Sequence, residues 1–66
     1  MNPVRASAFA IARAYAGERG LPVRLAFDDS LSGDLARLNL MRRLRTAFPL
    51  TPIRAVDELI EEVFTP

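Results

Sequence analysis

The chain has 66 residues, a formal net charge of +1 and an apolar content of 50%. A chain this short forms one domain, here residues 1–66, and buries only about 60% of the surface that its unfolded form exposes. It contains no cysteine, histidine or lysine, which excludes disulfides, thiolate and imidazole metal sites, and the most common catalytic bases and nucleophiles. The sequence therefore predicts a non-enzymatic protein that uses no cofactor and no metal.

No apolar run approaches the roughly eighteen residues of a membrane-spanning helix, and we expect a cytoplasmic protein. Asp28, Ser30 and Ser32 have the spacing of the first ligands of a calcium loop. However, the last ligand position holds Asn39 instead of a glutamate, and the chain from Asp34 onward has a helical pattern. We therefore interpret this stretch as the start of a helix.

The first predicted helix spans about residues 3–18. Asn2 is a favourable N-cap, and Pro3 suits the first helical position, where an N–H group is not needed. Gly17 or Gly20 is expected to end the helix. Alanine occupies every second position from 6 to 16, which leaves a thin surface that another helix can approach closely.

Residues 21–27 break the helical period. Val23, Leu25 and Phe27 alternate with more polar positions, and this period of two is typical of a strand. A single strand has no partner within the chain, so the segment either pairs with a second copy or serves as an extended linker. We favour the linker, because glycine and proline precede it.

The second predicted helix spans about residues 32–48, with Ser30 or Ser32 as its cap. Its apolar residues form more than one stripe, which is typical of a helix that packs against several neighbours. We therefore expect it to be the central helix. Leu31, Leu35 and Leu38 share one face, and Met41, Leu44 and Phe48 point about 100° away, with Leu40 further round.

The third predicted helix spans about residues 52–64 and is preceded by the potential cap Thr51. Four carboxylates lie in its last turns, where the helix dipole disfavours negative charge, and those spaced four residues apart repel each other. A compensating positive surface is expected, and the arginines of the second helix match these acids in number. Those arginines are Arg37, Arg42, Arg43 and Arg45.

The predicted architecture is all-α, with three helices and the short extended segment 21–27.

The apolar content exceeds what one small core needs, which favours a protein-protein interaction module or adaptor that acts as a homodimer. The contact face is expected to consist of the apolar residues left over on the central helix, together with one phenylalanine of the first helix. Flanking arginines would select a partner by charge. The predicted contact residues are Phe9, Leu40, Met41, Leu44 and Phe48, flanked by Arg42, Arg43 and Arg45.

An alternative follows from the order of the elements. An alternating segment at 22–27 followed by two amphipathic helices resembles the ribbon-helix-helix regulators and antitoxins. The resemblance implies that two chains pair their ribbons and place outward side chains, here Arg24, in the major groove of DNA. The first helix is an addition to that pattern, and the second helix is longer than the pattern has. The nucleic-acid contacts would be Arg24, Arg37, Arg42, Arg43 and Arg45.

Overall fold

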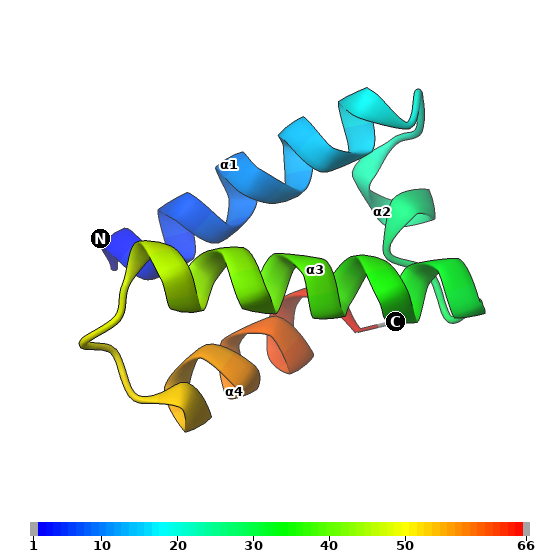
Figure 1. The fold of residues 1–66 in the computed structure, drawn as a ribbon. Coiled ribbons are helices and arrows are strands. Elements are labelled where there is room, and N and C mark those ends of the chain that lie inside the picture. Colours follow the sequence, from blue (N-terminus) through cyan, green and yellow to red (C-terminus); the bar gives the residue numbers. More distant parts are fainter. Residues whose placement is uncertain (1, 66) are drawn as a thin grey trace.

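The computed structural model describes residues 2–65 and is all-α, as predicted (Figure 1). Its helices are α1 (Pro3–Glu18), α2 (Val23–Ala26), α3 (Leu31–Ala47) and α4 (Ile53–Phe64). The three long helices lie within one residue of their predicted bounds. No strand occurs within residues 2–65, and none of the helices in this range has both the length and the apolar character needed to cross a membrane.

The predicted caps of α1 and α3 are confirmed. The Asn2 side chain accepts a hydrogen bond from the Val4 backbone N–H at 2.9 Å, and Ser30 accepts one from the Gly33 N–H at 3.1 Å. Ser30 is therefore the residue that caps α3. After α1 the chain turns at Gly20, whose φ of +69° favours glycine. Side-chain and backbone chemistry at the ends thus sets the bounds of both helices.

The predicted cap of the last helix is wrong. Pro52 occupies the N-cap position of α4, and no side chain caps this end. Thr51 instead lies in the turn between α3 and α4, where its backbone N–H donates to the Phe48 carbonyl at 3.1 Å. The fixed φ of proline starts the helix without a capping hydroxyl.

The predicted extended segment is also wrong, because residues 23–26 form the short helix α2 and neither a strand nor a linker. The Pro22 carbonyl accepts hydrogen bonds from the N–H groups of Leu25 and Ala26, both at 3.0 Å. Val23, Ala26 and Phe27 turn inward at helical spacing, while Leu25 is exposed. The alternation of apolar residues was misleading because Leu25 does not belong to the buried face.

The central position of α3 is confirmed. Helix α1 packs along one side of α3 and α4 along the other, while α2 closes the end at which α3 begins (Figure 1). The core has a thin, alanine-rich part on α1 and a bulkier part on α3 and α4. The buried residues are Ala8, Ala12, Ala16, Ala26, Phe27, Ala36, Leu40, Leu44, Val56, Ile60 and Phe64.

A chain of aromatic rings joins three of the helices near the end of α4. Phe64 lies between Phe9 of α1 and Phe27, with ring centroids 5.3 Å apart in both pairs. Phe27 also lies 5.9 Å from Tyr15. The rings are tilted, an arrangement that aromatic pairs prefer over a face-to-face stack. These contacts tie α1, the end of α2 and the end of α4 together.

Candidate protein-interaction surface

The inner face of α3 carries two of the residues that were predicted to meet a partner. Leu40 and Leu44 are only 1% and 0% exposed and belong to the core of the chain itself. They share this face with the small residues Gly33 and Ala36. Their assignment to a surface left over for a partner is therefore wrong, because they already fill the space between α3 and its neighbours.

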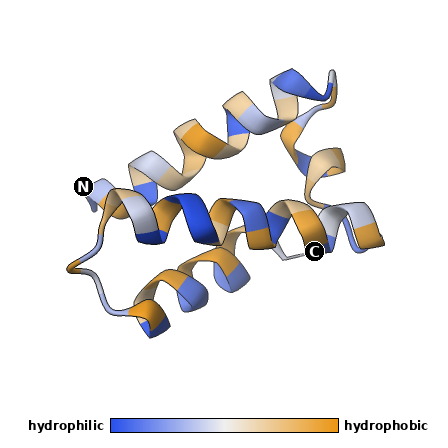
Figure 2. Ribbon diagram, viewed as in Figure 1, coloured by the Kyte–Doolittle hydropathy of each residue, from blue (hydrophilic) through white to orange (hydrophobic). Residues whose placement is uncertain are grey.

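The opposite, outer face of α3 carries the apolar residues that the core leaves over. Leu31, Leu35 and Leu38 are 75%, 57% and 53% exposed. Their spacing of four and then three residues places them on one line along the helix, and we call them the leucine row. The hydropathy colouring of Figure 2 shows apolar positions toward the start of α3 and a strongly hydrophilic stretch toward its end.

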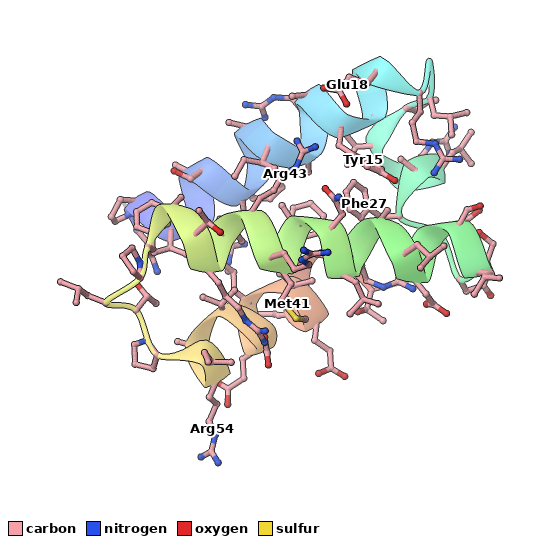
Figure 3. The ribbon with its side chains drawn as sticks, viewed as in Figure 1. Tyr15, Glu18, Phe27, Met41, Arg43 and Arg54 are labelled. Carbon is pink, nitrogen blue, oxygen red and sulfur yellow. The ribbon has the colours of Figure 1, made fainter. Side chains whose placement is uncertain are left out.

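The remaining apolar residues of the predicted contact face are half-buried. Phe9 packs its ring on Phe64, and Phe48 ends α3 and packs against the core. Met41 lies on the side of α3 that faces α4 (Figure 3). None of the three lies on the line of the leucine row, so the structure does not bring the predicted contact residues together on one surface.

The arginines of α3 divide into paired and exposed ones. Arg45 contacts Asp57 of α4 at 2.7 Å, which confirms one ion pair of the predicted charge-matched flank. Arg42 and Arg43 are exposed and make no ion pair within residues 2–65. Arg43 lies on the side of α3 that faces α1 (Figure 3). The hydrophilic end of α3 is therefore a free cationic surface.

Arg37 serves the fold. Its Nη1 lies 3.0 Å from the Phe27 carbonyl, 2.9 Å from the Asp28 carbonyl and 3.3 Å from the Phe64 carbonyl, and donates to them. Its Nη2 contacts the Asp34 carboxylate of the same helix. The side chain is only 13% exposed. Arg37 therefore links α3 to the segment before it and to the end of α4, and it is not part of the free cationic surface.

The ribbon that the ribbon-helix-helix alternative needs is absent from the described residues, because the segment forms α2. Arg24, the proposed reader of DNA, is an exposed residue of this short helix. Of the four arginines on α3 in that alternative, Arg37 and Arg45 are engaged within the chain. The order of elements that suggested the resemblance is therefore wrong at its first element.

The start of α3 is acidic. Asp28 accepts hydrogen bonds from both the hydroxyl and the backbone N–H of Ser30, and these bonds, with Arg37 nearby, hold the pKa of its carboxyl below the ordinary value. Asp29 is exposed, and the Asp34 side chain is 60% exposed. Negative charge at a helix start is favourable because it complements the helix dipole.

An open hollow of about 550 Å³ lies beside the leucine row, between α3 and α4. Leu38 and Met41 border it from α3, and Ile60 borders it from α4. The hollow extends the apolar surface of the leucine row toward α4.

Within residues 2–65 no group of three acidic side chains is arranged to hold a metal ion.

The sequence contained a signal that identifies the leucine row. Gly33, Ala36, Leu40 and Leu44 recur at helical spacing, and two of them are small, like the buried alanines of α1. Two thin surfaces pack closely, so the face with Gly33 and Ala36 is the inner one, and leucines on the opposite side remain exposed.

No protein-family model, curated protein or solved structure gives a significant match to the chain.

Proposed function

We propose that this chain is a small, non-enzymatic protein-protein interaction module that acts as a homodimer through the outer face of α3. The observation that carries the proposal is the exposed leucine row. Isolated exposed leucines are ordinary, but three on one line form a continuous apolar strip. Complete burial of one leucine side chain contributes roughly 1.5–3 kcal/mol, so the row supplies several kcal/mol to any partner that covers it.

A second copy of the chain fits this surface. The four-then-three spacing of Leu31, Leu35 and Leu38 is the spacing of a coiled-coil contact line, in which leucines of one helix insert between those of an identical helix. A short domain also gains from self-association, because its own core is small. The arginines beyond the row and the acids before it would flank the contact.

A nucleic-acid function has less support. The arginines that remain exposed from that alternative are Arg24, Arg42 and Arg43, and Arg24 lies on a different helix from the other two. The chain carries eight acids against nine arginines, so it lacks the strong positive charge that phosphate contacts usually need.

Sedimentation equilibrium over a range of protein concentrations tests the proposal. The wild-type chain should reach twice the 7.3 kDa of one chain. Leu35→Asp should return it to the monomer mass, because a charge in the middle of the row cannot be buried without a partner. The helical circular dichroism should stay unchanged, because Leu35 is 57% exposed and lies outside the core.

Leu50→Asp provides the matched control. Leu50 is 98% exposed and lies in the turn between α3 and α4, outside the leucine row. This variant should keep the dimer mass. A wild-type chain that stays at 7.3 kDa at every concentration, or a Leu35→Asp chain that still dimerises, would overturn the proposal.

A further inference from the structure

The outer face of α3 has opposite charges at its two ends. The end at which the helix begins carries Asp34 and follows the exposed Asp29, whereas Arg42 is the exposed arginine that continues the outer face toward the other end. The leucine row lies nearer the acidic end. The surface proposed above for self-association is therefore directional, and the direction limits how a second copy can pack on it.

Arg42 continues the line of the leucine row. It follows Leu38 by four residues, as Leu35 follows Leu31, so the contact line reads Leu31, Leu35, Leu38, Arg42. In a parallel pair of α3 helices, Arg42 would face Arg42 of the second copy, and like charges in contact repel. In an antiparallel pair, Arg42 would lie across Leu31 of the second copy, near that copy's acidic end.

We infer that two copies pair antiparallel along α3, with Leu35 of each copy against Leu38 of the other and Arg42 beside the second copy's Asp29 and Asp34. This inference rests on the proposed function and adds the orientation and charge pairing of the partner. Arg42 and Asp29 are exposed and make no ion pair within the described residues, and Asp34 keeps its side chain 60% exposed while it contacts Arg37 of its own helix. The aliphatic stem of Arg42 can cover Leu31, which is 75% exposed, while its guanidinium reaches a carboxylate.

Distances between identical positions in the dimer test the orientation. The chain has no cysteine, so a single introduced cysteine gives one spin label per chain. Ser32→Cys and Thr46→Cys use exposed positions near the two ends of α3, off the contact line. With a rise of about 1.5 Å per residue, the antiparallel pair separates the two residues 32 by about 13 Å along the helix axis and the two residues 46 by about 28 Å.

The two possible failures are distinguishable. A parallel pair would leave identical positions at the same height along the two helix axes, so neither pair of labels would gain an axial separation. That result, in a chain of dimer mass, would overturn the antiparallel arrangement and leave the proposed homodimer standing. A chain of monomer mass with no label coupling would overturn both.

A charge exchange tests the pairing of Arg42. Arg42→Glu should weaken dimerisation on the order of tenfold, because glutamate would lie beside the second copy's acids. Adding Asp29→Arg to the same chain should restore the dissociation constant, because acid and base have then exchanged places. The control is Arg54→Glu, the same change of charge on a side chain that points away from the bundle (Figure 3), and it should leave dimerisation unchanged. Equal effects of Arg42→Glu and Arg54→Glu, or no restoration by Asp29→Arg, would overturn the pairing.

Discussion

The two faces of α3 carry the same residue type in opposite environments. Leu40 and Leu44 on the inner face are almost completely buried, whereas Leu35 and Leu38 on the outer face are more than half exposed. The two faces differ in the size of the residues that lie beside the leucines. Gly33 and Ala36 share the inner face with Leu40 and Leu44, and Gly33 lies close against the Asp28 backbone of the loop that precedes α3. The number of leucines on a helix therefore does not identify its buried side; the size of the residues between them does.

The largest expected effect comes from shortening an inner leucine. Leu44→Ala should cost about 2–5 kcal/mol of unfolding free energy, because it leaves a cavity in a closed core. A domain of this size has only about 3–10 kcal/mol in total. Leu38→Ala is the matched change on the outer face and should alter the stability of the monomer by less than about 1 kcal/mol.

Urea denaturation followed by circular dichroism measures both changes. Placing both in the Leu35→Asp background removes the proposed dimerisation from the comparison. Similar losses of stability at Leu44 and Leu38 would contradict the division of α3 into an inner and an outer face.

A second comparison concerns the small residue at the start of the inner face. A Cβ atom at Gly33 would lie 2.0 Å from the Asp28 carbonyl oxygen, so Gly33→Ala forces the preceding loop to move. We expect a loss of about 1–3 kcal/mol. Gly17 in α1 has no atom within 4 Å of such a Cβ, and Gly17→Ala should stabilise the chain by about 0.5–1 kcal/mol.

Thermal unfolding of the two alanine variants measures these changes. The expected outcome is a lower midpoint for Gly33→Ala and a higher one for Gly17→Ala. A shift in the same direction for both would contradict the interpretation that position 33 needs glycine because a Cβ atom has no room there.

Arg37 lies at the border between the two faces, and its substitution measures how much its hydrogen bonds contribute to the free energy of unfolding. Arg37→Gln removes the donor shared by the carbonyls of Phe27, Asp28 and Phe64. The expected loss is about 1–3 kcal/mol, since partly buried carbonyls lose a charged donor. Amide hydrogen exchange should become faster at the end of α4. Arg24→Gln on α2, which removes an exposed arginine, should leave both quantities unchanged.

The smallest expected effect concerns Asp28 and depends on pH. The Ser30 hydrogen bonds lower the folded-state pKa of the Asp28 carboxyl. The resulting stabilisation is present above the ordinary aspartate pKa of about 4 and is lost as the pH falls through the lower folded-state pKa. Ser30→Ala should raise this pKa toward its ordinary value, and Ser32→Ala should leave it unchanged. A carboxyl carbon NMR titration follows the pKa directly.

Much of the fold was predictable from the sequence. Asn2, Pro3 and Ser30 mark the starts of two helices, and the clear division of apolar and acidic residues over 53–64 predicted α4. The short helix α2 was not predictable from periodicity, because four helical residues make barely one turn. Its backbone follows from Pro22 and from the burial of Ala26 and Phe27 under neighbours that are distant in the sequence.

The candidate surface was harder to predict for a physical reason. Leucine is equally suited to a core and to an interface, so hydropathy alone cannot divide five leucines between two faces of α3. The exposed state of Arg42 and Arg43 depends on where α4 lies, since α4 reaches Arg45 but not these two. Only the packing of the whole chain decides which arginine remains free.

The aromatic chain that joins the helices has a consequence for spectroscopy. Tyr15 is the only tyrosine and the chain has no tryptophan, so nearly all of its near-ultraviolet absorbance and emission arises at one ring. That ring lies against Phe27, and its hydroxyl is 3.4 Å from Arg19. An unlabelled sample therefore reports optically on the corner where α1 meets α2, at the end of the molecule where α3 begins, and the cationic end of α3 contributes almost nothing to the signal.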